Sequence, residues 1–595
     1  MDPGPTEEYQ ARLKTRNEAL ERCRRLDRLV ANLRLTAAIV FFAVAWLAWG
    51  MGTVSGWWML VPLAAYVALV IYHERVYRMG RRANRSVAFY GRGLARIEDR
   101  WAGTGDSRTQ FSDHGHPYAQ DLDIFGNGSL FELLSNARTR SGEAKLAEWL
   151  SAPAPRPEIL LRQAAVGELR NNIDLREDLA ILGEEVEGVI HPELMKRWGM
   201  APPRLASRKA RIVAPVLAAF AVISIIAYYA VNASGWLVLT AFVAEAAFAF
   251  HYRKPVREVT SLVDQPTKDL KILALVLARL ELEQFKSEKL RGLRAALETE
   301  HKPPSVQIAW LARLIELLDS RLNMGFAPIG AVLLWTTQLA FAMEAWRRRC
   351  GPAVGRWLDA VGELEALCAL AGYAYEHPGD PFPEIAENET CFEGAELRHP
   401  LLPSARSVAN SVHLNGNLQL LVVSGSNMSG KSTLLRTVGI NAVLAFAGAP
   451  VRARHLRLSV LRIGATIRVM DSLQAGTSRF YAEIQRLRDI MELTKGPTPV
   501  LFLLDEILHG TNSHDRAVGA EAVVRGLVSR GAIGLVTTHD LALAQVAKAL
   551  GDKAANVHFQ DHLENGKMVF DYSLRPGVVQ KSNALELMRA VGLEV

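Results

Sequence analysis

Cysteine is scarce in this 595-residue sequence. Its four cysteines show no CxxC spacing or other metal-ligand pattern, so the sequence offers neither a disulfide framework nor a zinc site. This pattern fits a protein of a reducing compartment. Internal repeats and low-complexity tracts are also missing, while the length allows several domains. The cysteines are Cys23, Cys350, Cys368 and Cys391.

Charge is absent from a long stretch near the N-terminus. Residues 35–72 contain no Asp, Glu, Lys or Arg, and the turn-like run 52–56 divides them into two apolar halves. Each half is just long enough for a short membrane span. We therefore predict a transmembrane hairpin over 35–72, with Trp57 and Trp58 at the membrane interface.

A second apolar block covers residues 212–252 and is divided at 232–235. It holds a single acid, Glu245, and is predicted to be a second transmembrane hairpin. Glu245 is either a functional intramembrane carboxylate, or it lies near the cytoplasmic end of its span or pairs within the bundle. Buried soluble hairpins are the alternative for both blocks, but soluble helices normally keep a charged face.

Arginine and lysine flank both blocks on each side. This pattern places both ends of each hairpin in the cytoplasm. The prediction is an integral protein of the plasma (inner) membrane with four spans and with both termini and the C-terminal domain in the cytoplasm. The net charge of +7 fits anionic lipid as well as nucleic acid. The flanking residues are Arg22, Arg24, Arg25, Arg28, Arg34, Arg75, Arg78, Arg81, Arg82, Arg85, Arg208, Lys209, Arg211, Arg253, Lys254 and Arg257.

The remaining chain before residue 380 has a helical pattern. Residues 269–297 show apolar spacings of three and four, which predicts one long amphipathic helix. Residues 326–343 are apolar, and we predict a buried helix ending at Glu344 and Arg347 to Arg349, because a fifth span would move the C-terminal domain across the membrane. The Pro-rich and Gly-rich run 377–383 marks the last domain boundary. The predicted parts are a basic segment 1–34, hairpin 35–72, linker 73–119, helical part 120–211, hairpin 212–252, helical part 253–380 and a final domain 384–595.

A phosphate-binding loop follows the apolar run 418–424. The nine residues after this run have the P-loop pattern and lead into a helical segment, which is the context that the motif requires. Backbone amides would cradle phosphates, Lys431 would reach the β and γ oxygens, and the Ser432 hydroxyl would bind Mg²⁺. The predicted nucleotide-binding residues are Gly425, Ser426, Asn427, Met428, Ser429, Gly430, Lys431, Ser432 and Thr433.

Two further apolar runs end in polar side chains. The run 500–504 precedes Asp505 and Glu506, as in a Walker B motif, so Asp505 would hold Mg²⁺ and Glu506 would polarise the attacking water. The run 532–538 precedes His539, a candidate γ-phosphate sensor. Because parallel sheets gather ligands at the carboxyl ends of their strands, these side chains should meet near Lys431. The candidate catalytic residues are Glu506, His539 and Lys431.

Together these segments resemble the MutS family of the ABC ATPase class. The resemblance rests on the P-loop, on 505–515 with its Asp-Glu start, on Thr537-Thr-His539 and on the signature-like run 471–483. It implies an ATP- and Mg²⁺-dependent ATPase that forms a homodimer, in which Ser478 contacts the nucleotide of the other subunit. Arg479 stands where threonine is usual in that family. Weaker similarity from residue 120 onward implies a helical core and lever domain.

The fold expected is therefore multi-domain: α-helical transmembrane hairpins, an α-helical MutS-type core and lever, and a C-terminal α/β P-loop domain. The sequence shows no mismatch-reading domain and no DNA clamp. The leading hypothesis is a membrane-anchored dimeric ATPase that couples nucleotide state to lever or membrane movement or to a protein partner that the sequence does not name. The alternatives are a membrane-tethered ATPase that binds DNA structures and an ABC-type transporter.

Overall fold

The computed structural model describes residues 4–578 except 106–108, 112, 114, 183–191, 206, 262–266, 299–301, 324, 427, 469–478, 509–510, 540 and 565–566. The chain divides into two compact units. The first unit comprises Met1–Leu134, Leu150–Ile159 and Gly372–Val595, and the second comprises Ser135–Trp149 and Leu160–Ala371.

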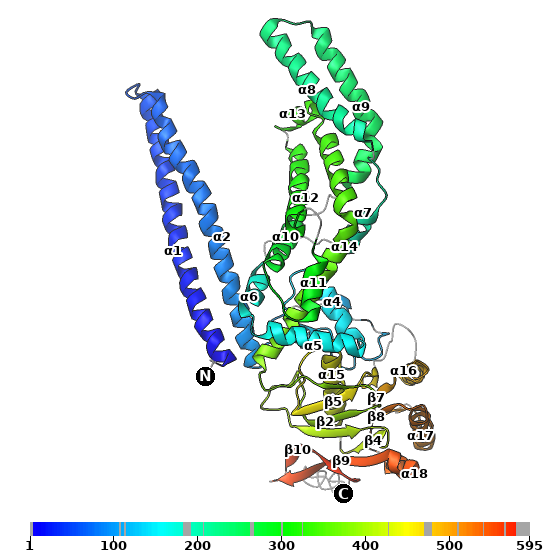
Figure 1. Cartoon of the computed structure of the whole chain (residues 1–595). Helices are drawn as coiled ribbons and strands as arrows, with labels where there is room; N and C mark the ends of the chain where they lie inside the picture. The colour runs from blue at the N-terminus through cyan, green and yellow to red at the C-terminus, as the bar shows by residue number, and fades with distance from the viewer. Residues whose placement is uncertain are drawn as a thin grey trace. The chain divides into compact units, whose positions relative to one another are not determined.

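The first unit begins with two long helices that pack against each other, α1 (Pro5–Ala45) and α2 (Leu60–Ile97) (Figure 1, blue). A π-helical turn at Trp46–Gly50 and a 3-10 turn at Gly56–Met59 lie between them. Both helices extend well beyond the uncharged residues 35–72. The charged parts of the two helices also carry apolar residues at helical spacing, and these residues make contacts. Short elements follow at Thr109–Phe111 and Leu130–Leu134 (α3).

Four helical segments among the described residues are long and apolar enough to cross a membrane, by length and composition. Their apolar side chains point outward: Trp49 is 80% exposed and Tyr229 is 81% exposed. Large exposed apolar surfaces of this kind are unusual in water. The segments are Pro5–Gly50, Gly56–Ile97, Lys209–Val231 and Gly235–Thr260.

The polar ends of α1 and α2 join the end of helix α14 (Trp335–Glu376) in a buried cluster. The Arg96 guanidinium donates from Nε to Oε2 of Glu376 (2.6 Å) and from Nη2 to Oε1 (2.5 Å), and the Glu376 side chain is fully buried. The Tyr9 hydroxyl donates to the same carboxylate at 3.4 Å, and its ring packs over Gly93. We call Tyr9, Gly93, Arg96 and Glu376 the foot of the first hairpin.

The second unit is helical. Helices α8 and α9 form its apolar hairpin, in which Glu245 of α9 is 4% exposed and, among the described residues, its Oε1 has no hydrogen-bond partner. The helices, of which α4, α5 and α14 extend into the first unit, are α4 (Arg140–Ser151), α5 (Arg156–Arg170), α6 (Ile173–Ile181), α7 (Pro192–Met200), α8 (Arg208–Val231), α9 (Gly235–Ser261), α10 (Thr267–Glu281), α11 (Glu288–Ala296), α12 (Pro304–Asp319) with a 3-10 turn at Ser320–Leu322, α13 (Ala327–Val332) and α14 (Trp335–Glu376).

The prediction of one helix over 269–297 is wrong, because the chain breaks between α10 and α11. The carboxylate of Glu168 accepts the backbone amides of Lys286 and Ser287, each at 2.7 Å. A carboxylate that binds free amides at a helix N-terminus stabilises a new helix start. The periodicity continues across the break, so the sequence pattern did not reveal it.

The predicted helix over 326–343 is also wrong in its bounds. Leu334 has a φ of 47°, which a continuous right-handed helix does not allow, and it separates α13 from α14. Helix α14 then runs through Glu344, where the prediction ended it, and continues to Glu376. The side chains of Glu344 and Arg347 pair one turn apart within α14 (2.7 Å), which lets the buried charges remain helical.

The C-terminal part of the first unit is an α/β domain with a six-stranded sheet in the order β10-β9-β4-β8-β7-β6. All neighbouring strands are parallel except the β9–β10 pair. Apolar strands such as β7 are buried on both faces, as parallel sheets require. The elements are β4 (Leu420–Ser424), α15 (Lys431–Ala447), β6 (Arg462–Thr466), α16 (Arg479–Leu493), β7 (Val500–Asp505), α17 (Ser513–Ser529), β8 (Ile533–Thr538), α18 (Leu541–Leu550), a 3-10 turn at Gly551–Lys553, β9 (Ala554–Glu564) and β10 (Lys567–Pro576).

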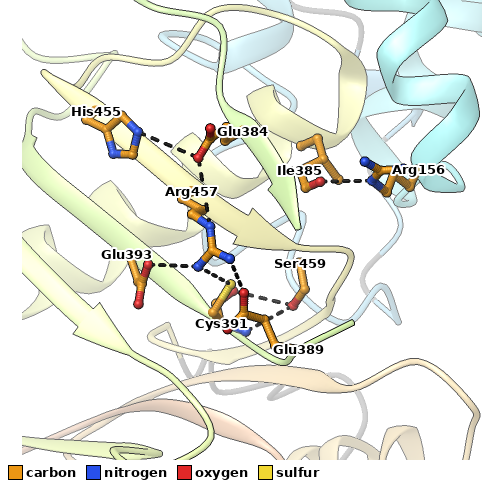
Figure 2. A network of polar contacts seen from close by, with 9 residues as sticks. All are labelled: Arg156, Glu384, Ile385, Glu389, Cys391, Glu393, His455, Arg457 and Ser459. Atoms are coloured by element: carbon orange, nitrogen blue, oxygen red, sulfur yellow. Dashed lines mark hydrogen bonds and ion pairs between the residues drawn. The ribbon is translucent and has the colours of Figure 1, made fainter. Parts of the chain in front are cut away.

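A second sheet of four strands has the order β1-β5-β2-β3. Arg457 of β5 crosslinks it by contacting Glu393 of β2 (3.0 Å), Glu384 of β1 (3.8 Å) and Glu389 (Figure 2). Arg156 donates to the Ile385 carbonyl at 2.9 Å, which ties the start of α5 to the sheet edge. The strands are β1 (Glu384–Ala386), β2 (Phe392–Leu397), β3 (Asn410–Leu414) and β5 (His455–Ser459).

Candidate functional site

The P-loop lies between the central strand β4 and helix α15. Gly430 has a φ of 102° and Met428 a φ of 69°, so the chain turns sharply before α15 begins at Lys431. This left-handed conformation explains a glycine at position 430. Asn427, also predicted to bind phosphate, lies outside the described residues.

Lys431 is held inside the loop. Its ammonium donates to the carbonyls of Gly425 and Ser426, both at 2.9 Å, and lies 3.2 Å from Oε1 of Glu506. The side chain is only 5% exposed. A buried ammonium with one carboxylate partner is a strong attractor for further negative charge.

Asp505, Glu506 and His539 meet at the carboxyl ends of β7 and β8. The Thr537 hydroxyl donates to Oδ1 of Asp505 and accepts the Glu506 amide at 3.0 Å, which links the two strands. Nδ1 of His539 lies 3.5 Å from Oε1 of Glu506. The structure therefore brings Lys431, Glu506 and His539 together, as the strand-end pattern predicted.

Lys431, Asp505 and Glu506 line a cavity of about 780 Å³, which we call the P-loop cavity. It is large enough for a nucleotide-sized ligand. P-loop residues, the two acids, loop 402–408 and Tyr572 of β10 contribute to its walls. The lining residues are Leu397, His399, Leu402, Ala405, Arg406, Ser407, Val408, Asn410, Met428, Gly430, Lys431, Ser432, Thr433, Leu434, Thr437, Asp505, Glu506, Phe559 and Tyr572.

Tyr572 was not predicted to belong to this site. Its backbone has a φ of 54° beside an irregularity in the β9–β10 pairing, and Asn410 fixes it by donating to the Tyr572 carbonyl (2.9 Å) and accepting the Leu574 amide (2.7 Å). A Cβ at Gly430 would lie 3.1 Å from Cδ1 of Tyr572. The aromatic ring thus lies against the P-loop, where it can contact a bound ligand.

The residues fit an Mg²⁺–nucleotide. Ser432 and Asp505 line the same cavity and supply a hydroxyl and a carboxylate, which are oxygen ligands that Mg²⁺ accepts. Within the described part of the chain, the buried hydroxyl of Ser429 has no hydrogen-bond partner. Such an unpaired buried group in a phosphate-binding loop leaves a donor for a ligand oxygen.

His399 forms a buried part of the cavity wall. Burial, with the nearby positive charge of Arg436, lowers the pKa of His399 to about 4. The neutral ring accepts the Leu401 amide at Nδ1 (3.2 Å). At neutral pH the His399 ring is therefore uncharged, whereas the P-loop side of the cavity carries the ammonium of Lys431.

The predicted signature segment is mostly beyond what the structure describes. Ser478 lies outside the described residues, and Arg479 begins α16. Farther along α16, the buried Glu483 accepts the Leu508 amide, just after Glu506. Helix α16 is thus tied to the segment that carries the Walker B acids.

Comparison with known proteins shows what this domain is similar to. Residues 421–594 match the family described as MutS domain V. We call this stretch domain V after that similarity. The match begins within β4 and includes the P-loop, Asp505, Glu506 and His539.

Curated relatives agree with this assignment. The chain is 33% identical over 238 residues to the DNA mismatch repair protein MutS of Natronomonas pharaonis, covering 39% of this chain and 27% of that protein. It is 33% identical over 248 residues to the endonuclease MutS2 of Thermus thermophilus (40% and 31%). It is 31% identical over 254 residues to the MutS of Geobacillus thermodenitrificans (41% and 27%). The chain thus spans less than a third of the length of these relatives.

Proposed function

We propose that the P-loop cavity binds Mg²⁺–ATP and hydrolyses it. The observation that carries the proposal is the convergence of Lys431, Asp505 and Glu506 on one cavity, with His539 lying 3.5 Å from Glu506. Lys431 would bind the β and γ phosphates, and Glu506 would orient and polarise the attacking water. When bound between Ser432 and Asp505, Mg²⁺ would neutralise charge on the phosphate oxygens.

Release of Lys431 from Glu506 is part of this proposal. In the structure the two groups lie 3.2 Å apart, so Glu506 is paired with the Lys431 ammonium. A γ-phosphate would compete for Lys431 and leave Glu506 available to a water molecule. His539, which lies 3.5 Å from Glu506, would then sense the γ-phosphate by one hydrogen bond.

The same chain would be anchored in the plasma (inner) membrane by α1–α2 and α8–α9, with domain V in the cytoplasm. The exposed apolar surface of the four candidate spans and their arginine-rich flanks support this proposal. We further propose a homodimer through domain V, with Ser478 and Arg479 of one subunit facing the nucleotide of the other. Nucleotide state would then act on the helical unit, the hairpins or a protein partner.

The test uses the full chain in lipid nanodiscs. Wild-type protein should hydrolyse ATP in the presence of Mg²⁺, and Lys431→Ala should lose ATP binding. Glu506→Gln should bind ATP, hydrolyse it about 10²–10⁴-fold more slowly, and accumulate as a dimer in light scattering. Full activity of Glu506→Gln would refute the role of Glu506, and release of intact protein from membranes by carbonate would refute integral anchoring.

DNA binding is the second candidate function, because the curated relatives are named as mismatch repair and endonuclease proteins. It predicts that DNA stimulates hydrolysis with a steep dependence on salt. Crosslinking the ATP-trapped Glu506→Gln protein separates the candidates, since it can recover DNA or a protein partner. ATPase activity that is indifferent to every DNA form would contradict this second function.

A further inference from the structure

The chain just after α2 touches the wall of the P-loop cavity. Asp99 has a φ of 56°, and its Oδ2 accepts the backbone amide of Ser404 at 2.8 Å. Ser404 lies within loop 402–408, and five other residues of this loop line the cavity. The base of the first hairpin and the cavity wall are therefore joined by one hydrogen bond across 305 residues of sequence.

Loop 402–408 is held at both ends and in its middle. At Leu402 and Ser407 it is held from within the C-terminal domain: the Leu402 amide donates to the His399 carbonyl (3.2 Å), Arg398 donates to the Ser407 carbonyl (2.6 Å), and the His399 amide donates to the Ser407 hydroxyl (2.9 Å). At Ser404 the backbone amide is bound by Asp99 and the hydroxyl by Arg452 (2.5 Å). The hydrogen bond to the Ser404 amide thus comes from the base of the first hairpin.

Asp99 is linked to α2 through the foot of the first hairpin. Arg96, three residues before Asp99, is locked to Glu376 by two hydrogen bonds in a buried site. A Cβ added to Gly93 would lie 2.5 Å from Cε2 of Tyr9, so α1 and α2 are in close contact at this level. A shift of the hairpin at its base must therefore displace Asp99 or break the foot.

We propose that Asp99 is a positioning residue through which the first hairpin controls nucleotide affinity. It holds loop 402–408 in the conformation that closes the cavity around the ligand. The inference rests on the proposed ATP-binding function and adds the place where the hairpin acts on it. Because coupling between two sites is reciprocal, nucleotide binding also acts on the packing of α1 against α2.

Two substitutions at position 99 separate the hydrogen bond from the backbone geometry. Asp99→Gly removes the acceptor but accepts the positive φ, whereas Asp99→Asn keeps an oxygen acceptor and also tolerates this conformation. The matched control is Glu98→Ala, since Glu98 is an exposed neighbour that pairs with Arg100. All variants are compared as full chains in nanodiscs.

The KM for ATP in Asp99→Gly should rise about tenfold, the upper end of the net contribution of one hydrogen bond, while kcat stays within about twofold. Asp99→Asn and Glu98→Ala should keep the wild-type KM. A wild-type KM in Asp99→Gly overturns the inference, and so does an equal loss of kcat in the Gly and Asn variants. An inactive wild-type protein would instead refute the proposed ATPase function.

The reciprocal effect can be read at Cys23. This half-buried residue of α1 faces Gly80 of α2, where a Cβ would lie 3.6 Å from the Cys23 Cβ, and the other three cysteines are buried. In Glu506→Gln, saturating ATP should change the rate of maleimide modification of Cys23 by about fivefold or more. Adding Asp99→Gly should abolish this change at saturating ATP. An ATP-independent rate in Glu506→Gln alone overturns the coupling.

Discussion

The buried ion pair of the foot provides a quantitative test of how the first hairpin is attached. Glu376 is fully buried and Arg96 is 8% exposed, so removing either partner takes a doubly hydrogen-bonded ion pair out of a buried site. Arg96→Met or Glu376→Met alone should therefore cost about 3–5 kcal/mol. Replacing both by Met should recover most of that loss, because no buried charge remains.

The measurement must be local, since one free energy of unfolding is not defined for a chain with several parts. Amide hydrogen exchange of peptides from the start of α1, around Tyr9, reports the opening of the foot. A loss of about 3 kcal/mol corresponds to exchange about 150-fold faster in each single variant. The double variant should exchange within about tenfold of the wild type.

Two outcomes would refute this reasoning. Exchange within about threefold of wild type in both single variants would mean that the pair contributes little to the attachment. If amide exchange in the double variant is accelerated by the product of the two single accelerations, Arg96 and Glu376 act independently. Peptides from β7, remote from the foot, supply the internal control.

Four further predictions concern the cavity and the cores. Tyr572→Ala should weaken ATP binding about tenfold by calorimetry, because the ring faces the ligand beside the P-loop; an unchanged affinity would remove Tyr572 from the site. The folded-state pKa of His399 is lowered to about 4, so the contribution of this neutral histidine to the free energy of unfolding is complete above pH 6.5. That contribution falls by up to about 3 kcal/mol as the pH drops from 6.5 to 4. His399→Gln should flatten this fall in thermal melts. Burial raises the pKa of Glu365 to about 7, so its contribution to stability is present below pH 4.5 and is lost as the pH rises toward 7. Glu365→Gln should therefore melt at a higher temperature than wild type at pH 8 but not at pH 4. A variant that melts with the wild type at both pH values would contradict the raised pKa. Gly439→Ala should destabilise domain V by about 1–3 kcal/mol in denaturant titration, since its Cβ would lie 2.6 Å from Leu122; a neutral effect would show that Leu122 can move.

Periodicity gave weaker guidance in the helical unit than motif spacing did in domain V. The apolar spacing of 269–297 is helical throughout, yet Glu168, over a hundred residues earlier, binds the amides that start α11. Leu334 likewise interrupts the apolar run 326–343, although neither Leu334 nor its two chain neighbours is Gly or Pro. Both breaks depend on contacts or backbone angles that a window of neighbouring residues does not contain.

The sequence by itself determined the phosphate end of the site, because the P-loop and the Walker B acids are each contiguous segments whose strand-loop-helix context can be read locally. Parallel strand ends then required Lys431, Glu506 and His539 to lie together. The opposite wall was decided only by tertiary structure. Tyr572 and loop 402–408 reach the cavity through long-range packing, and Asp99 touches that loop because the foot brings the first hairpin against the domain.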